Sequence, residues 1–153
     1  MSSVLAEVLL VEDEADDAEL LTRALTQMRP GTRVTVISDG VEALRQLLGD
    51  DDKPQAQMPK LIILDLNLPG LDGIEVLRCL TANARTAKIP VVVLSGTCSP
   101  EDVGASRSYG AKACMRKPSS GGDMRPVARG LAGQLHALGV VGPVERAVAG
   151  VAE

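Results

Sequence analysis

Two features of the sequence predict an α/β domain in which five parallel strands form one sheet with helices on both faces. The first is a series of short runs of Val, Leu and Ile with almost no polar residue, typical of strands buried on both faces. The second is that these runs alternate with longer stretches in which apolar residues recur every three or four positions, as on amphipathic helices. Repeated strand and helix units of this kind form a doubly wound parallel sheet.

Five such units account for most of the chain. In chain order, they are strand 8–11 and helix 14–28, strand 33–37 and helix 41–48, strand 61–64 and helix 73–84, strand 91–95 and helix 100–109, and strand 112–116 and helix 123–138. The acidic run 50–59, which contains two prolines, is expected to be an exposed loop. Residues 139–153 are expected to be either a frayed tail or a short amphipathic helix.

The first two helices are defined by their apolar period and by the residues that stop them. The first carries apolar residues near a period of about 3.6, and Pro30 with Gly31 ends it. Its apolar positions are Ala18, Leu21, Ala24, Leu25 and Met28. The second begins after Ser38 to Gly40, and Gly49 closes it.

The last three helices are bounded by residues suited to helix ends. Asp72 is placed to cap the third helix after the tight turn 68–70. Ser99 precedes the fourth helix, which has Pro100 at its first position. Gly139 is expected to end the fifth helix.

Composition argues against several classes of function. The 153 residues are expected to form one domain over residues 6–138. The net charge of -4, the lack of any block of Lys or Arg, and the single aromatic residue, Tyr109, argue against nucleic-acid binding. No apolar stretch approaches the ~20 residues of a membrane span, and the start of the chain carries no basic leader, so neither membrane insertion nor export is expected. Cys79, Cys98 and Cys114 form no CxxC pair, and reduced thiols in a cytoplasmic protein are expected.

Polar residues that could form a site follow four of the predicted strands. They are Glu12 and Asp13 after the first strand, Asp65 after the third, Ser95 at the end of the fourth and Lys117 after the fifth. Because the carboxyl ends of parallel strands share one edge of the sheet, these side chains are expected to meet. Carboxylates, a hydroxyl and an ammonium, without Cys or His, suit a hard divalent cation and a phosphoryl group.

The chemistry expected at this edge is phosphorylation of Asp65. Asp65 interrupts an apolar run, where an acid is costly unless it is paired or functional. A carboxylate attacks a phosphoryl donor readily only when cations reduce the repulsion, and Mg²⁺ suits the available ligands. Lys117 is expected to pair with one phosphoryl oxygen, and Ser95 to donate a hydrogen bond to another. The expected metal ligands are Glu12, Asp13, Asp65 and the backbone carbonyl of Asn67.

These residues stand in four characteristic segments. They are Val-Glu-Asp-Glu at 11–14, Leu-Asp-Leu-Asn-Leu-Pro-Gly-Leu-Asp-Gly at 64–73, Val-Leu-Ser-Gly at 93–96 and Lys-Pro at 117–118. With these segments, the chain resembles the receiver domain of two-component response regulators over residues 6–138. The resemblance implies a flavodoxin-like fold with strand order 2-1-3-4-5, and phosphorylation of Asp65 by a histidine kinase. It also implies that Mg²⁺ is held by the four groups named above, and that Ser95 and Lys117 are the switch hydroxyl and the lysine of the family.

The resemblance extends to partners. Residues 65–69 and 89–95 are most similar to small stand-alone receivers that partner bacterial phytochromes, which implies a sensor histidine kinase of that type. No DNA-binding or catalytic domain is expected after residue 138, so the output is expected to be protein contact. A homodimer is expected to use the face made by the fourth helix, the fifth strand and the fifth helix. The family usually has Tyr or Phe three residues before its lysine, where this chain has Cys114. Signal output is therefore expected to depend on the Ser95 loop and on that face.

Two other functions fit part of the pattern. One is a receiver-like scaffold that is never phosphorylated, which the complete set of acids, hydroxyl and lysine disfavours. The other is a Mg²⁺-dependent phosphohydrolase that uses Asp65 as a transient nucleophile. Such enzymes usually carry a second acid two residues after the nucleophile, and here that residue is Asn67. The chain is therefore expected to accept phosphate rather than to act as an enzyme.

Overall fold

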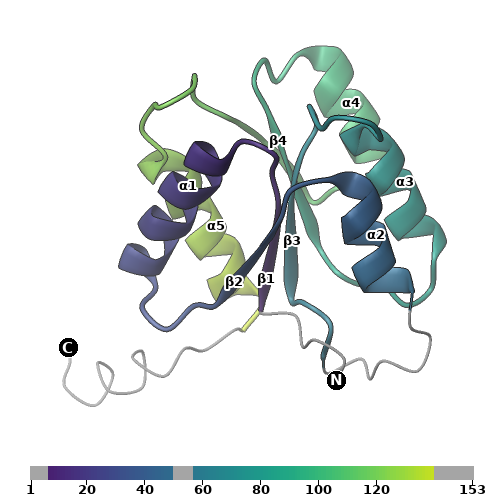
Figure 1. Ribbon diagram of the computed structural model, residues 1–153, viewed down its shortest axis with the longest axis horizontal. Helices are drawn as coiled ribbons and strands as arrows, with labels where there is room; N and C mark the ends of the chain where they lie inside the picture. Colours follow the sequence, from purple (N-terminus) through teal and green to yellow (C-terminus); the bar gives the residue numbers. More distant parts are fainter. Residues whose placement is uncertain (1–6, 50–56, 140–153) are drawn as a thin grey trace.

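The computed structural model describes residues 7–49 and 57–139, and it has the predicted α/β fold. Five parallel strands form one sheet in the order β2-β1-β3-β4-β5 (Figure 1). The strands are β1 (Val8–Val11), β2 (Val34–Ile37), β3 (Leu61–Asp65), β4 (Val91–Ser95) and β5 (Ala113–Arg116). The predicted tail beyond Gly139 and most of the predicted loop 50–59 lie outside the described residues.

A helix follows each strand, and the helices cover both faces of the sheet. They are α1 (Ala15–Met28), α2 (Gly40–Leu48), α3 (Gly73–Ala82), α4 (Pro100–Ser108) and α5 (Arg125–Ala137). Helices α1 and α5 lie together on one face, and α2, α3 and α4 lie on the other (Figure 1). This division is expected of right-handed crossovers, because the chain moves from β1 out to β2 and then back across to β3, β4 and β5. None of the described helices is long and apolar enough to cross a membrane.

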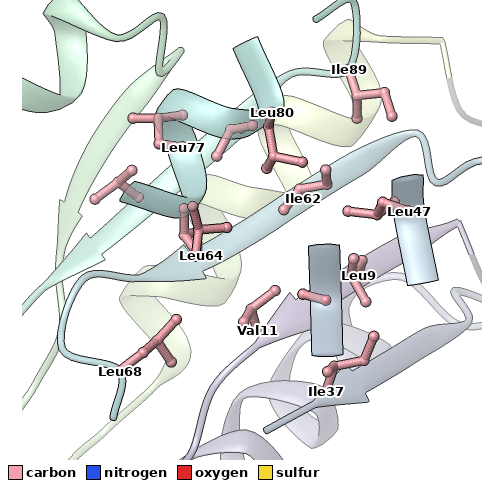
Figure 2. Packing of buried hydrophobic residues seen from close by; sticks show 14 of the residues in the cluster. Leu9, Val11, Ile37, Leu47, Ile62, Leu64, Leu68, Leu77, Leu80 and Ile89 are labelled. Atoms are coloured by element: carbon pink, nitrogen blue, oxygen red, sulfur yellow. The ribbon is translucent and has the colours of Figure 1, made fainter. Parts of the chain in front are cut away.

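The strands bury side chains on both faces, which explains their unbroken apolar runs. Leu9, Val11 and Leu64 belong to the layer under α2 and α3 (Figure 2). Leu10 and Ile63, which alternate with them, belong to the layer under α1 and α5. Burying each such side chain contributes roughly 1.5–3 kcal/mol. Two aliphatic layers therefore make up the core of a chain without Trp or Phe.

The predicted caps of α3 and α4 are present. Asp72 Oδ1 accepts a hydrogen bond from the amide of Ile74 at 2.7 Å. Ser99 Oγ accepts one from the amide of Asp102 at 3.0 Å, and Pro100 occupies the first turn of α4. Both caps satisfy amides that have no partner within the helix, so they fix where each helix begins after its strand.

Helices α1 and α4 are one residue shorter than predicted, and α3 and α5 differ by more, because side chains near their ends bind backbone amides. Helix α3 ends at Ala82 rather than at 84, since Asn83 has an extended backbone and its Oδ1 accepts from the amide of Arg85 at 2.9 Å. Helix α5 begins at Arg125 rather than at 123, since Asp123 Oδ1 accepts from the Arg125 amide at 3.0 Å. Such local bonds offer the backbone an alternative to the helix.

Candidate functional site

Three carboxylates meet at the carboxyl edge of the sheet, where β1 and β3 end. The register of these neighbouring strands pairs Val11 with Leu64, so Glu12 and Asp65 leave the sheet at the same level. Glu12 lies two residues after Leu10, and Asp65 lies two residues after Ile63. Because alternate residues of a strand share a face, both acids lie on the face that is covered by α1 and α5. Asp13 comes next, and one oxygen of each of the three carboxylates lies within 4.8 Å of the others.

The ammonium of Lys117 binds two of these acids. Its Nζ lies 2.7 Å from Glu12 Oε1 and 2.8 Å from Asp65 Oδ2. The lysine is held at this edge because its backbone amide donates to the carbonyl of Ser95 at 2.8 Å. The side chains of Glu12 and Asp65 are only 2% and 3% exposed, and that of Lys117 is 12% exposed. With so little water between them, these charges interact more strongly than a surface ion pair.

A fourth carboxylate, that of Asp17 in α1, was not among the residues predicted from the sequence. Its Oδ2 lies 3.2 Å from Lys117 Nζ, and its side chain is buried. Its Oδ1 has no hydrogen-bond partner among the described residues. The sequence does contain a signal for it, because Asp17 lies one turn before Leu21 and places a charge on the apolar stripe of its helix.

Backbone amides fix the orientation of two carboxylates. Glu12 Oε2 accepts a hydrogen bond from the amide of Glu14 at 3.1 Å, and Asp65 Oδ1 accepts one from the amide of Asn67 at 2.9 Å. The other oxygen of each carboxylate, Glu12 Oε1 and Asp65 Oδ2, binds Lys117. Asp65 and Asn67 also line an open hollow of about 270 Å³. Its wall includes Asp13, Asp17 and Lys117.

Burial and charge set the protonation of the site. Burial raises the pKa of the Glu12 carboxyl to about 7, although hydrogen bonds from Lys117 and from the Glu14 amide act in the opposite direction. Burial alone would lower the pKa of Lys117, but the hydrogen bonds to Asp65 and Glu12 outweigh it, so the pKa of the ammonium is raised. Lys117 therefore stays charged at neutral pH. With Glu12 ionised, the four carboxyl groups and one ammonium carry a formal net charge of -3, and a proton on Glu12 reduces it to -2.

The donor set fits a divalent cation with oxygen ligands. The carboxylates of Glu12, Asp13 and Asp65 are close enough to share one ion, and Asp17 Oδ1 is a buried oxygen nearby that lacks a partner. Hard cations such as Mg²⁺ are usually held by one or two carboxylates together with water and phosphoryl oxygens. Asn67 lines the same hollow, close to where its predicted carbonyl ligand is needed. A cation here would also offset the excess negative charge.

Ser95 lies at the same edge, but its hydroxyl is bonded to α4. Ser95 lies two residues after Val93 on β4, so it is on the same face of the sheet, the one that packs against α3. Its Oγ donates to Asp102 Oδ2 at 2.7 Å and accepts from the amide of Cys98 at 3.0 Å. The bond from Ser95 is the main cause that lowers the pKa of the Asp102 carboxyl. The predicted bond to a phosphoryl group therefore requires this hydroxyl to change partner.

The fold and the site together define a class of protein. The acids of β1 and β3 lie where the strand order reverses, which is where doubly wound sheets bind their ligands. The chain is thus an α/β domain with an acidic cation site at its switch point. It belongs to the response regulator receiver domain family, whose profile matches residues 8–129, and so it is a receiver of two-component signalling.

Several relatives are response regulators, and two of the solved structures among them are named for phytochromes. Response regulator Rcp1 of Synechocystis is 32% identical over 124 residues, which cover 81% of this chain and 84% of Rcp1. The Mn²⁺-bound form of Rcp1 matches with a TM-score of 0.69 and 31% identity over 89% of this chain and 96% of that structure. The phosphorylated cyanobacterial phytochrome response regulator RcpA matches with a TM-score of 0.73 and 29% identity over 89% and 95% of the two chains. The bacteriophytochrome response regulator RtBRR matches with a TM-score of 0.69 and 33% identity over 84% and 76%.

Proposed function

We propose that the chain is a phosphorylation-controlled binding module, in which Asp65 accepts a phosphoryl group from a histidine kinase with the help of Mg²⁺. The phosphorylated chain then signals by contact with another protein. The observation that carries this proposal is the place of Asp65, whose carboxylate lines the open hollow beside Lys117 and two further carboxylates. Neither a purely structural ion pair nor a solvated acid needs that combination.

The reaction is a displacement at phosphorus. A carboxylate oxygen of Asp65 forms a bond to phosphorus while the bond from phosphorus to the donor's histidine nitrogen breaks, and its electron pair leaves with the imidazole. The amide of Asn67 and the ammonium of Lys117 hold the carboxylate in one orientation, which lowers the entropic cost of attack. Lys117 already lies beside Asp65, so it can pair with a phosphoryl oxygen without a large rearrangement.

The residues that would hold Mg²⁺ are Glu12, Asp13 and Asp65, with the backbone carbonyl of Asn67 as a further ligand. Bound Mg²⁺ supplies positive charge that neutralises the acids and the phosphoryl oxygens. The proposal is supported by the spacing of the three carboxylates and by the Mn²⁺-bound form of Rcp1. Mn²⁺ and Mg²⁺ both prefer oxygen ligands.

The proposed donor is the histidine kinase of a phytochrome. Support comes from the likeness to RcpA and RtBRR, which are named as phytochrome and bacteriophytochrome response regulators. The test is phosphoryl transfer from a purified phytochrome kinase in its two light-adapted states. Light-dependent transfer to Asp65 is expected. If an acetyl phosphate reaction labels the chain but no phytochrome kinase does, the partner is of another kind.

The proposed output surface is the face made by α4, β5 and α5. Helix α4 is held lightly, since Ser106 is its one buried residue, whereas α1 buries five. A lightly packed helix next to Ser95 is well placed to shift when that hydroxyl changes partner. Sedimentation with and without acetyl phosphate and Mg²⁺ tests whether the partner is a second copy. A monomer under both conditions would exclude the homodimer.

The decisive experiment is the intact mass of the chain after incubation with acetyl phosphate, with and without Mg²⁺. Wild type is expected to gain one phosphoryl group that depends on the metal and is removed by hydroxylamine, as an acyl phosphate should be. Asp65→Asn is expected to gain none. Asp16→Asn is the matched control, because Asp16 is an exposed acid of α1 near the same edge. It should be labelled like wild type.

Two outcomes would favour the other functions considered from the sequence. No labelling of a chain that still binds Mg²⁺ would support a phosphate-independent scaffold. Rapid consumption of the donor by wild type but not by Asp65→Asn, without accumulation of the labelled chain, would support a phosphohydrolase. Asn67 weighs against the second, because an amide cannot act as the acid or base that serves a leaving group.

A further inference from the structure

Two cysteines lie side by side next to the Ser95 loop. Cys98 belongs to the connection between β4 and α4, and Cys114 lies on β5, opposite Val93 of β4. Their sulfur atoms are 3.8 Å apart, and both side chains are partly buried. The proposed phosphorylation chemistry uses neither thiol. Cys114 occupies the position, three residues before Lys117, at which receivers usually carry Tyr or Phe, and its smaller side chain leaves room for a second sulfur.

The backbone of Cys98 is unusual. Its φ is 46°, and it is the only residue other than glycine with a positive φ in the described part of the chain. Residues with a Cβ rarely adopt this left-handed backbone conformation, and such strain often accompanies a functional position. The Cys98 amide donates to Ser95 Oγ at 3.0 Å, so the strained residue is tied directly to the hydroxyl of the site.

From this geometry we propose that Cys98 and Cys114 form a reversible disulfide within the chain when the protein meets a peroxide. The bonded sulfurs of a disulfide are about 2.05 Å apart, so the two sulfurs of this pair must approach by about 1.8 Å. Rotation of the two side chains, one of them on the irregular connection between β4 and α4, can supply a movement of that size. Because Cys98 and Cys114 are 16 residues apart in the sequence, their spacing did not predict this contact. The register of β4 with β5 and the turn after Ser95 bring them together.

The step balances with peroxide as the oxidant. Cys98 attacks one peroxide oxygen, the O–O bond breaks, and the products are a Cys98 sulfenic acid and water or an alcohol. Cys114 then attacks the Cys98 sulfur, the S–O bond breaks, and the hydroxyl leaves as water with the proton from the Cys114 thiol. Burial raises the pKa of Cys114 to about 11, which lowers its thiolate fraction and disfavours it as the thiol that reacts first with peroxide.

The disulfide would restrain the site, a consequence that rests on the proposed function. It would join the loop after Ser95 to β5, only three residues before Lys117. Because the Cys98 amide binds Ser95 Oγ, fixing Cys98 also favours the arrangement in which Ser95 donates to Asp102. The oxidised chain is therefore expected to accept phosphate from acetyl phosphate several-fold more slowly than the reduced chain.

The disulfide itself is tested without phosphorylation. The full chain is treated with hydrogen peroxide, free thiols are blocked, and the protein is digested and mapped by mass without reduction. Wild type and Cys79→Ser are expected to lose two hydrogen atoms within one chain and to yield a peptide that joins Cys98 to Cys114, which dithiothreitol separates. Cys98→Ser and Cys114→Ser should form no such link. Cys79 lies on α3 and serves as the control thiol.

The proposal fails if wild type yields only higher oxidation products, only links between chains, or links through Cys79. The regulatory consequence is judged separately by labelling oxidised and reduced Cys79→Ser with acetyl phosphate. Equal rates would refute the restraint while leaving the disulfide in place. If neither form is labelled, the proposed phosphorylation fails, and the mapped peptide still decides the disulfide.

Discussion

The hydroxyl of Ser95 donates its single proton to Asp102 Oδ2 at 2.7 Å. A hydroxyl has one hydrogen to donate, so Ser95 cannot keep this bond and also donate to a phosphoryl group on Asp65. Thr97 Oγ1 donates to the same Asp102 oxygen at 3.0 Å, which strengthens the hold of α4 on the loop. Asp102 thus competes with the phosphoryl group for the hydroxyl of the site.

Removing that competitor should favour phosphorylation. Asp102→Ala frees a hydroxyl whose bond to a charged acceptor is worth about 1.5–3 kcal/mol. Because about 1.4 kcal/mol corresponds to a tenfold change in rate, we expect labelling by acetyl phosphate to be about tenfold faster or more. The rate is measured by intact mass over time. Glu101→Ala is the matched control, because Glu101 is an exposed acid in the same first turn of α4. A rate equal to that of wild type, or a gain that persists when Ser95→Ala is added, would contradict this account.

Lys117 should stabilise the fold as well as the site. In Lys117→Met, the buried acids Glu12 and Asp65 lose their cation. We expect the free energy of unfolding without metal to fall by about 3 kcal/mol, the low end for a broken buried ion pair. We expect the low end of that range because Glu12, with a pKa of about 7, can take up a proton and so lose its uncompensated charge. Urea denaturation at neutral pH measures it, and saturating Mg²⁺ should recover part of the difference.

The exposed lysine just before β5, Lys112, provides the control for that experiment. Lys112→Met removes the same charge from the same part of the chain without touching the acids, so its stability should stay within about 0.5 kcal/mol of wild type. If both variants lose the same stability, the effect belongs to net charge rather than to the site.

Metal affinity should depend on pH through Glu12. The pKa of its carboxyl is about 7 in the folded chain against an ordinary value of 4.5, so the metal-free folded state holds this proton longer than the unfolded state. Without metal, this group's contribution to stability is complete below pH 4.5 and is lost as the pH rises to about 7. A cation needs the ionised carboxylate, so its affinity should weaken about tenfold per unit as the pH falls below about 7.

Calorimetric titration with Mg²⁺ across this range measures that dependence. Glu12→Gln should bind more weakly at high pH and lose most of the pH dependence. Glu19→Gln, which removes an exposed acid of α1, should behave like wild type. A steep pH dependence that remains in Glu12→Gln would assign the proton to another group.

Gly73 is required where α3 approaches the end of β3. A Cβ on Gly73 would lie 2.6 Å from the carbonyl oxygen of Asp65 and 2.6 Å from the Cα of Leu66. Backbone atoms cannot yield as a flexible side chain can, so Gly73→Ala should lower the free energy of unfolding by about 1–3 kcal/mol and weaken Mg²⁺ binding. Denaturation and the titration above measure both.

Gly104 in α4 is the matched comparison. A Cβ there would meet no described atom within 4 Å. Gly104→Ala should therefore stabilise the chain by about 0.5–1 kcal/mol, because alanine loses less backbone entropy in a helix. Equal effects at the two glycines would show that helix propensity, rather than the close approach at β3, decides the result.

Much of the fold could be predicted because its signals are local. Runs such as Val8–Val11 reflect strands buried on both faces, and Asp72 and Ser99 mark helix starts because a cap acts on amides within three residues. The meeting of Asp65 with Lys117, which are 52 residues apart, was also predictable. It needs only the rule that parallel strands end at a common edge.

The tertiary structure decided which groups interact at that edge. The sequence by itself determined that Asp17 is acidic, but only the packing of α1 against the sheet placed its carboxylate beside Lys117. The sequence likewise placed Ser95 at a strand end. Only the face of the sheet on which Ser95 lies, and the position of α4, determined that its hydroxyl donates to Asp102. The physical reason is that hydrogen bonds and ion pairs depend on differences of about an ångström between elements distant in the chain. Hydrophobic period and capping act within a few residues, so they define the elements and leave those contacts to their packing.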